Sequence, residues 1–265
     1  MKKTLFIISL LLLWYSSPAQ TIERWQGKKC AVVITYDDAI DQHLDHAQPV
    51  LDSLGLKATF YIAAFSSSVQ KRLPEWKNLA AKGHELGNHT LYHPCLGSLS
   101  GRAWVTMETD LSHYTVRRIQ DEIRMTNLFL QALDGKTERT YAYTCGDMKI
   151  GDTSFIDDLK NELVAARSVR NKLSRIEEVD LYDTDCYVVN GESANQLIRW
   201  VKEAEKTGSL FVILFHGVDG GNPLNVSSEA HREFLIYLKN HEQDIWIAPM
   251  LDVAKHIRQW QAANR

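Results

Sequence analysis

The stretch Cys30-Ala31-Val32-Val33-Ile34-Thr35-Tyr36-Asp37-Asp38 is the part of the chain that indicates its fold most clearly. The residues before the two acids are almost continuously apolar, which is typical of a strand covered by other elements on both faces. Such strands belong to parallel sheets, because crossover helices lie on the faces of these sheets. The two carboxylates stand where the strand ends, and this end is where parallel α/β folds carry their functional residues.

Helix and strand signals alternate along the rest of the chain. Leu44, Ala47, Leu51 and Leu54 repeat at helical spacing, and Gly55 ends that helix. No repeat or linker interrupts the alternation, which predicts an α/β fold with a parallel sheet in one domain. Similar patterns predict strands over residues 58–62, 139–143, 163–166, 186–189, 210–215 and 245–248, a short strand that runs into His89, and helices over residues 73–82, 112–134, 195–206, 228–240 and 251–261.

The composition is that of an ordinary globular protein. Of the 265 residues, 45% are hydrophobic and 24% are charged. A single domain of this length buries a large core, and α/β barrels often reach this size as one unit. The formal net charge of -3 gives no indication of nucleic-acid binding.

The first residues have the pattern of a secretory signal. Lys2-Lys3 precedes an apolar run over residues 5–15, and Ser17-Pro18-Ala19 offers small residues to signal peptidase. We therefore predict a signal peptide over residues 1–19 and a mature catalytic domain over residues 20–265. The alternative is an uncleaved anchor helix, but the run is too short to span a bilayer comfortably. The mature protein is then secreted or periplasmic.

Two further patterns suggest a metal site. His89 and His93 are four residues apart, and on a helical turn this spacing places both imidazoles on the same face. Asp37 and Asp38 end the first strand, where one carboxylate can bind a metal while the other moves protons. Three protein ligands leave coordination positions open, as catalytic zinc sites do. The alternative is a solvated acid pair and two unrelated histidines.

His216 ends the apolar stretch Leu210-Phe211-Val212-Ile213-Leu214-Phe215 and opens a loop that contains glycines. A histidine in this place is suited to acid–base chemistry. Taken alone, a histidine in this place is more often a hydrogen-bonded core histidine.

Four motifs in fixed order resemble those of a known family. They are Thr35-Tyr36-Asp37-Asp38, His89-Thr90-Leu91-Tyr92-His93, Tyr141-Ala142-Tyr143-Thr144-Cys145-Gly146 and Ile213-Leu214-Phe215-His216. The set is similar to that of the NodB-type polysaccharide deacetylases, carbohydrate esterase family 4. The resemblance extends over almost all of the mature chain.

The resemblance implies a distorted (β/α)7 barrel and roles at matching positions. Asp37 corresponds to the general base and His216 to the general acid. Asp38, His89 and His93 correspond to the metal ligands. The implied reaction is the hydrolysis of an acetyl group by a water molecule held at the metal. Zinc is the expected ion, and this ligand set also accepts cobalt, nickel or manganese.

The chain departs from the family pattern in two places. Ala39 stands where the first motif has glycine, and Ala142 stands where the third motif often has an arginine that orients the base. We expect Arg167, at the end of a predicted strand, to take over this task. The alternative is a surface arginine. The oxyanion donor of the family, a backbone N–H of the third motif, falls at Cys145.

A protonated His216 requires a nearby carboxylate near neutral pH. Asp183 and Asp185, which precede a predicted strand, are candidates for this role.

The four cysteines allow three full pairings. Cys95 follows the second metal-ligand motif and Cys145 lies in the third, so a bond between them would brace the site; two free buried thiols are the alternative.

Trp104 lies in a long loop over residues 96–110 and is a candidate for stacking on a sugar ring. The alternative is an interior anchor.

We therefore predict a metal-dependent carbohydrate deacetylase that acts on N- or O-acetylated oligo- or polysaccharide. One rival prediction is an amidohydrolase that cleaves a non-sugar C–N amide bond. A second is a non-catalytic carbohydrate-binding protein on the same scaffold, and the retained acid–base pair argues against it. The sugar, its linkage and the oligomeric state are not encoded in these patterns.

Overall fold

A computed structural model describes residues 22–264 of the chain. The signal peptide predicted over residues 1–19 lies outside the described residues. The centre of the molecule is one sheet with strand order β7-β4-β3-β2-β1-β10-β8. Its parallel strands are β1 (Cys30–Asp37), β2 (Thr59–Ile62), β3 (Glu85–Asn88), β4 (Thr140–Ala142), β7 (Ala165–Arg167), β9 (Tyr187–Val188) and β10 (Ser209–Phe215), and β13 (Ile245–Ile247) also pairs with β1 in parallel.

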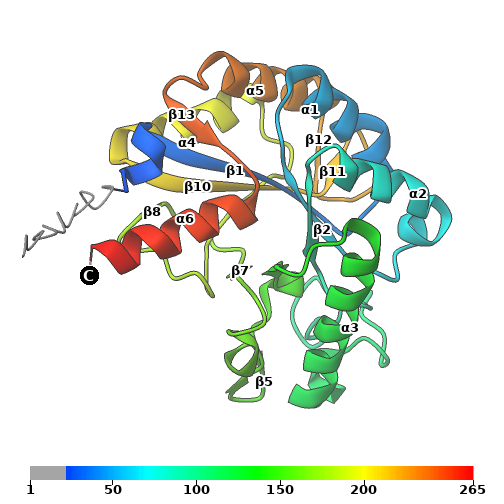
Figure 1. Cartoon of the computed structure of the whole chain (residues 1–265). Coiled ribbons are helices and arrows are strands. Elements are labelled where there is room, and N and C mark those ends of the chain that lie inside the picture. The colour runs from blue at the N-terminus through cyan, green and yellow to red at the C-terminus, as the bar shows by residue number, and fades with distance from the viewer. Residues whose placement is uncertain (1–21, 265) are drawn as a thin grey trace, which may run out of the picture.

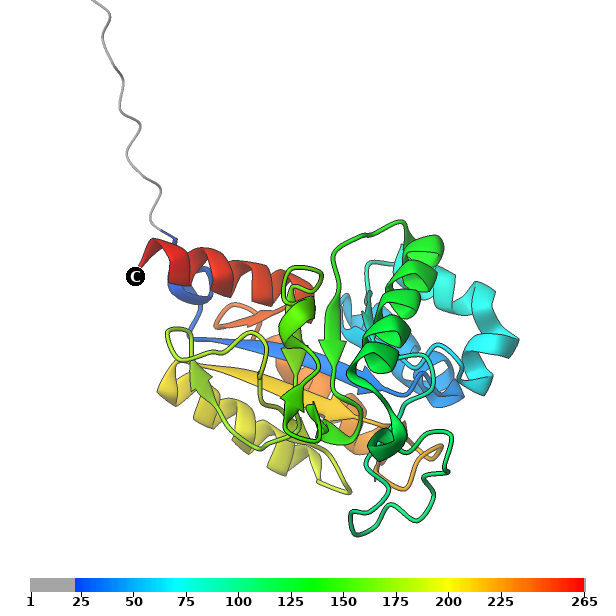
Figure 2. The ribbon, with the colours of Figure 1, turned by 90° about the horizontal axis from the view of Figure 1, so that it is seen from below.

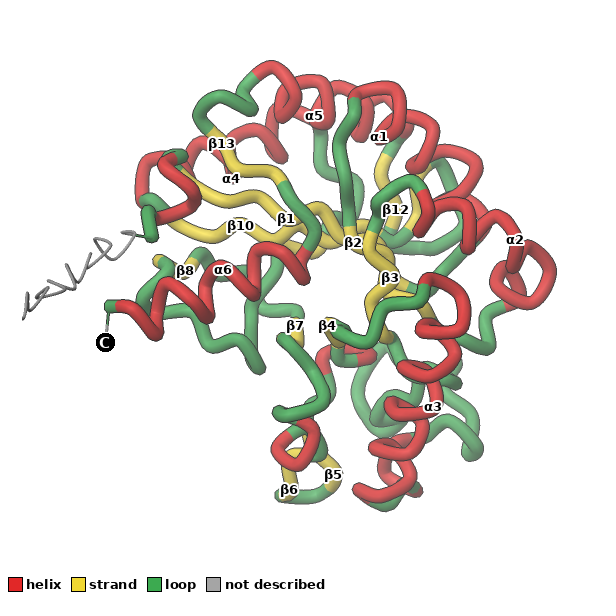
Figure 3. Tube along the Cα trace, viewed as in Figure 1, coloured by secondary structure: helices red, strands yellow, loops and turns green. Residues whose placement is uncertain are grey.

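Helices cover the outer face of this sheet, except for the C-terminal helix, which lies on the other side of β1 and β10, as Figures 1 and 3 show. The alternation predicted from the sequence is confirmed, with boundaries that differ mainly at helix starts. The largest difference is in α2, which begins at Ser67 because the Ser66 side chain accepts a hydrogen bond from Val69 N–H. The helices are α1 (Gln48–Leu54), α2 (Ser67–Ala81), α3 (Val116–Asp134), α4 (Ala194–Thr207), α5 (Ser228–Asn240) and α6 (Met250–Ala263).

An irregular segment joins the two ends of the parallel sheet into a barrel. Thr184 bridges to Arg167 of β7 in parallel orientation, and a few residues later β9 pairs with β10. The segment from Thr184 to Val188 therefore lies between β7 and β10. This arrangement is the distorted (β/α)7 barrel that was predicted, in a single domain.

Alternation along β1 decides which side chains enter the barrel. Val32, Ile34 and Tyr36 belong to the hydrophobic cluster beneath the outer helices. Ala31 and Val33 belong to a second cluster, with the inward residues of β10 and with α6. Since successive strand residues point to opposite faces, Asp37 falls on the same side as Ala31 and Val33, inside the barrel.

The ends of the described chain meet at one end of the molecule. Trp25, in the 3-10 turn Arg24–Gly27, packs in one cluster with Ile257 and Trp260 of α6. Figures 1 and 2 show the N-terminal segment beside the red C-terminal helix. No helix within residues 22–264 combines the length and apolarity needed to cross a bilayer.

Several short strands and helical turns lie around the barrel. They are the antiparallel β5 (Lys149–Ile150) and β6 (Thr153–Ser154), β8 (Ser174–Arg175), the paired β11 (Gly217–Val218) and β12 (Asn225–Val226), β13 (Ile245–Ile247), the π-helical turn η2 (His43–Ala47) and the 3-10 turns η3 (Leu111–His113), η4 (Thr144–Gly146) and η5 (Asp157–Leu159).

Candidate metal and acid–base site

The two acids of the first motif reach one site because the backbone turns sharply after β1. Asp37 is the last strand residue, and Asp38 and Ala39 then adopt φ angles of 80° and 53°. These are left-handed conformations that favour glycine, which explains the glycine at the position of Ala39 in the family pattern. Asn222, in the loop after β10, donates a hydrogen bond of 3.1 Å from Nδ2 to Asp38 Oδ2.

His89 and His93 lie in a loop and not on the helical turn that their spacing suggested. β3 ends at Asn88, and Thr90 and His93 have φ angles of 64° and 54°. The expectation of a helical turn is therefore wrong, although the pairing of the rings is right. The His93 N–H donates to Thr90 Oγ1 at 2.9 Å and the Thr90 N–H donates to Asn88 Oδ1 at 2.8 Å, so side chains stabilise the tight loop.

Three candidate ligand atoms converge at the carboxyl ends of β1 and β3. Asp38 Oδ1 lies 3.5 Å from His89 Nε2 and 3.2 Å from His93 Nε2, and all three ligand atoms are within 4.8 Å of one another. Asp38 Oδ1 is buried and has no hydrogen-bond partner among the described residues. A buried, unsatisfied carboxylate oxygen that faces two imidazole nitrogens fits a divalent transition metal.

The charges in this cluster reinforce one another. Burial by itself raises the pKa of Asp38, but the adjacent His89 and His93 hold it well below its usual range. Burial opposes a charged His93, but Asp38 raises the pKa of its ring. The carboxylate is therefore ready to bind a cation.

Each candidate histidine ligand has a second contact at its other ring nitrogen. His89 Nδ1 lies 2.8 Å from the carbonyl oxygen of Ala142, so this nitrogen carries the proton and Nε2 faces the other ligands with its lone pair. His93 Nδ1 lies 3.6 Å from Cys95 Sγ, which is a weak acceptor.

Arg167 is fully buried and forms an ion pair with Asp37. The alternative of a surface arginine is therefore wrong. Its other contacts are the Ser168 carbonyl at 3.1 Å, Cys186 Sγ at 3.2 Å and the Tyr61 ring, whose centroid is 5.0 Å away. Arg167 occupies one oxygen of Asp37, and the other, Oδ1, is buried without a hydrogen-bond partner. This second oxygen is free to accept a proton.

His216 follows β10 and lies near the acids. Burial lowers the pKa of its ring, and the carboxylates of Asp38 and Asp37 oppose this shift. His216 Nδ1 has no hydrogen-bond partner among the described residues. The backbone of His216 is held by His43, whose Nε2 lies 2.8 Å from the His216 carbonyl oxygen.

The expectation that Asp183 or Asp185 supports His216 is wrong. Arg170 forms ion pairs with both carboxylates, at 2.5 Å with Asp183 and 2.7 Å with Asp185. The carboxylates that act most strongly on His216 are those of Asp38 and Asp37.

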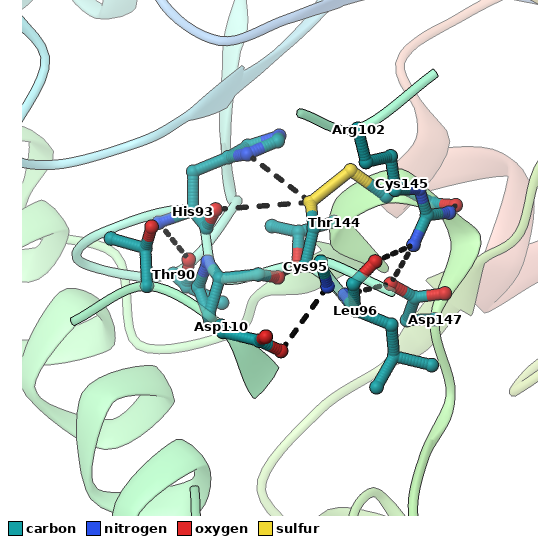
Figure 4. The surroundings of a disulfide bond; sticks show 12 residues. Thr90, His93, Cys95, Leu96, Arg102, Asp110, Thr144, Cys145 and Asp147 are labelled. Atoms are coloured by element: carbon teal, nitrogen blue, oxygen red, sulfur yellow. Dashed lines mark hydrogen bonds and ion pairs between the residues drawn. A yellow bond between two sulfur atoms is a disulfide. The ribbon is translucent and has the colours of Figure 1, made fainter. Parts of the chain in front are cut away.

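Cys95 and Cys145 form a disulfide, and the alternative of two free thiols is wrong. Figure 4 shows this bond beside His93. Cys145 has a φ angle of 55°, and Arg102 donates a 2.9 Å hydrogen bond to its carbonyl oxygen. Arg102 also forms an ion pair of 2.5 Å with Asp147, so the loop after His93 is tied to the third motif by both a covalent and an ionic link.

Trp104 is 56% exposed, and its ring centroid lies 6.0 Å from that of His93. It is therefore not an interior anchor. It stands at the edge of the candidate metal site, on the loop that projects from the body in Figure 2.

Several residues that support the candidate site were not identified from the sequence. His43, Arg102 and Asn222 each contact a candidate site residue from a distant part of the sequence. Their sequence surroundings carry no motif, because hydrogen bonds between loops leave no periodic pattern. Only the glycines near Asn222 indicate a close contact. A Cβ atom at Gly221 would lie 2.1 Å from Gln42 Oε1, so this loop has room for no side chain at that position.

The chain matches one known protein family over more than half of its length. The sequence profile of the family described as polysaccharide deacetylase matches residues 25–161, which is more than half of the chain. A gellan lyase from a Bacillus species is 21% identical over 91% of this chain, and the uncharacterized protein YlxY of Bacillus subtilis (strain 168) is 26% identical over 41%. The matched regions cover 10% and 29% of those two proteins, so most of each has no counterpart here.

Solved structures share the fold. A candidate polysaccharide deacetylase from Mycobacterium smegmatis superposes with a TM-score of 0.62 at 14% identity, covering 92% of this chain and 95% of that one. The peptidoglycan deacetylase PdaC from Bacillus subtilis gives 0.51 at 16% identity, covering 90% and 95%. BA3943 from Bacillus anthracis, a CE4 pseudoenzyme, gives 0.53 at 19% identity, covering 86% and 66%. The chain therefore belongs to the polysaccharide deacetylase family.

Proposed function

We propose that this protein is a metal-dependent hydrolase that removes acetyl groups from N- or O-acetylated carbohydrate. The observation that carries the proposal is the convergence of Asp38, His89 and His93 around an unsatisfied carboxylate oxygen. Asp37 and His216 stand beside this cluster as an acid–base pair. A fold shared with a pseudoenzyme is not enough for activity, so the proposal rests on these side chains.

Asp38 Oδ1 and the Nε2 atoms of His89 and His93 would hold the metal. Zinc is the ion that we propose first, and cobalt, nickel or manganese would suit the same ligands. When bound, the ion supplies Lewis acidity that polarises the acetyl carbonyl and makes a water molecule a better nucleophile. The hydrogen bond between His89 Nδ1 and the Ala142 carbonyl keeps Nε2 unprotonated for this task.

Asp37 acts as the general base in this scheme. Arg167 fixes the carboxylate through one oxygen and leaves Oδ1 to take the proton of the attacking water. Because Arg167 is fully buried, its position is set by packing and not by solvent. This guanidinium thereby takes over the task of the arginine that the third motif lacks.

His216 acts as the general acid and donates a proton to the leaving nitrogen or oxygen. Burial lowers the pKa of the ring, which makes the protonated form a stronger donor. The carboxylates of Asp38 and Asp37 favour the charged ring when the proton is needed. The Cys145 N–H, in a turn held by the disulfide and by Arg102, stabilises the oxyanion of the tetrahedral intermediate.

Trp104 offers an exposed ring near His93 for stacking against a sugar.

We further propose that the protein acts outside the cytoplasm, after cleavage of the signal predicted over residues 1–19. The Cys95–Cys145 bond supports this proposal, because disulfides persist in oxidising compartments.

The test is acetate release from acetylated xylan, chitooligosaccharides and peptidoglycan fragments, with and without a chelator. We expect activity to disappear on chelation and to return with added zinc or cobalt. Asp37→Asn should retain metal binding and lose turnover. Activity that is indifferent to chelation would refute the metal mechanism, and an active Asp37→Asn variant would refute the assignment of the base.

A further inference from the structure

The disulfide beside the candidate metal site brings a second set of metal-binding atoms together. Cys95 Sγ lies 3.6 Å from Nδ1 of His93 (Figure 4), and ligand atoms of His93, Cys95 and Cys145 all lie within 4.8 Å of one another. The other ring nitrogen of His93, Nε2, faces Asp38 at 3.2 Å. The imidazole of His93 is therefore shared by two groups of ligand atoms, one at each nitrogen.

The spacing on the sulfur side matches that of a tetrahedral zinc site. Zinc binds thiolate sulfur at about 2.3 Å and imidazole nitrogen at about 2.0–2.1 Å, so a sulfur and a nitrogen on the same ion are about 3.6 Å apart. The pair formed by His93 and Cys95 has this separation already. Only a thiolate is a good metal ligand, so the sulfur atoms bind an ion after the disulfide is reduced and not before.

The segments around the two cysteines are also held together by contacts that do not involve sulfur. The Thr144 hydroxyl donates a hydrogen bond to the Pro94 carbonyl oxygen, and the Leu96 N–H donates to Asp147 Oδ2 at 2.8 Å. Arg102 forms an ion pair with the same carboxylate. These contacts link residues next to each cysteine, so both thiols stay near the His93 ring when the disulfide is opened.

The disulfide can be reduced from one side. Cys95 is fully buried, whereas Cys145 is half-buried. A thiolate of a dithiol reductant attacks Sγ of Cys145, the S–S bond breaks, and its electron pair goes to Sγ of Cys95, which takes up a proton. The second thiol of the reductant then displaces Cys145 from the mixed disulfide. The protein gains two electrons and two protons, and the dithiol is oxidised to a disulfide.

We propose that reduction of the Cys95–Cys145 disulfide creates a second metal site, formed by the two thiolates and Nδ1 of His93. The ion displaces both thiol protons to solvent, and thiolate ligands select zinc or copper(I). A neutral imidazole has one nitrogen lone pair, so His93 serves either this sulfur site or the site of Asp38 and His89. The consequence, which rests on the proposed function, is that metal bound at the sulfurs removes a ligand from the catalytic ion.

The test is cobalt binding followed by absorption spectroscopy, before and after reduction. The protein is reduced with dithiothreitol, which gel filtration under nitrogen then removes, and tryptophan fluorescence reports whether the chain is folded. We expect sulfur-to-cobalt charge-transfer absorption in the reduced protein alone, and zinc binding about tenfold tighter than in the oxidised protein. A reduced protein that unfolds, or one that stays folded without this absorption, would overturn the proposal.

Three variants identify the ligands. Cys95→Ser/Cys145→Ser retains the two free buried thiols elsewhere in the described chain, and we expect no charge-transfer absorption after the same treatment. Absorption in this variant would assign the signal to those other thiols and overturn the site. His93→Phe should weaken cobalt binding by the reduced thiols about tenfold, whereas an unchanged affinity would remove His93 from the site. His89→Ala is the matched control, because it alters the other ligand group and should keep the absorption.

Acetate release separates failure of this inference from failure of the proposed function. We expect zinc-loaded wild type to lose at least about tenfold in activity on reduction and to recover it on reoxidation. Activity that persists after reduction, without charge-transfer absorption in the cobalt protein, would overturn the sulfur site and leave the proposed function intact. Charge-transfer absorption in a protein that releases no acetate in either state would overturn the proposed function and support the sulfur site.

Discussion

Removal of the Cys95–Cys145 disulfide should lower stability and metal affinity by separate mechanisms. The bond joins cysteines 50 residues apart in sequence. In the chain-entropy account, a crosslink over about 50 residues restricts the unfolded chain by about 4 kcal/mol. A domain with a free energy of unfolding of roughly 5–15 kcal/mol then stays folded but loses a large part of its margin. We expect this loss in the Cys95→Ser/Cys145→Ser double variant.

The effect on metal affinity follows from a short contact. Cys95 Sγ lies 3.6 Å from Nδ1 of His93, so the disulfide restrains the ring of a candidate ligand from its far side. Loss of such an outer partner typically weakens metal binding or activity by about 10–100-fold. We therefore expect weaker zinc binding in the double variant even where it is fully folded.

Urea unfolding followed by tryptophan fluorescence measures the first effect, and competition with a chromogenic chelator measures the second. Cys30→Ala is the control, since Cys30 is a free buried cysteine remote from the disulfide. Burial raises the pKa of the Cys30 thiol to about 12 and that of Cys186 to about 11, so both thiols are unreactive until the protein unfolds. A double variant within about 1 kcal/mol of wild type and with unchanged zinc affinity would refute the reasoning.

Two further predictions concern buried charges. Arg167→Met should lower the free energy of unfolding by about 3–5 kcal/mol, because it leaves the Asp37 carboxylate buried without its partner. Urea unfolding measures this loss, and a loss below about 1 kcal/mol would contradict the prediction. Burial lowers the pKa of His43 to about 4 and that of His231 to about 3. Both pKa values lie below the ordinary value of 6.5, so the unfolded chain binds more protons and stability falls as the pH drops from 6.5 towards 4, by about 1.4 kcal/mol per pH unit for each ring. His231→Phe should remove one such contribution to the slope of unfolding free energy against pH, and an unchanged slope would count against it.

The sequence allowed the fold and the candidate ligands to be predicted because both leave short-range patterns. The apolar run of β1 and its terminal acids are adjacent in the chain, and the alternation of strand residues places Asp37 inside the barrel. Arg167 was identified as a candidate because it ends a predicted strand, and the barrel brings the ends of such strands together.

The errors arose where loop geometry decides the contact. The spacing of His89 and His93 suggested a helix, yet a loop with two left-handed residues brings the rings together. Asp183 and Asp185 lie near a strand end as expected, but Arg170 binds both. Ion pairs between loops depend on side-chain directions, which no periodic pattern encodes.

The candidate site is also where the backbone departs most from ordinary preference. Asp38, Ala39, Thr90, His93 and Cys145 all have positive φ angles without being glycine. Each such conformation costs of order 1–3 kcal/mol and persists only where the surroundings enforce it.

Those surroundings can be identified for most of these residues. Asn222 binds the Asp38 carboxylate, the Thr90 hydroxyl accepts the His93 N–H, and the disulfide with Arg102 holds Cys145. The left-handed residues orient side chains and N–H groups towards the candidate site, whereas a regular strand or helix would direct them elsewhere. The restraints therefore do more than stabilise the fold, because each holds a candidate ligand or donor in a position that its own backbone disfavours. This is the physical reason to expect that substitutions in the supporting residues will reduce metal binding and turnover before they unfold the protein.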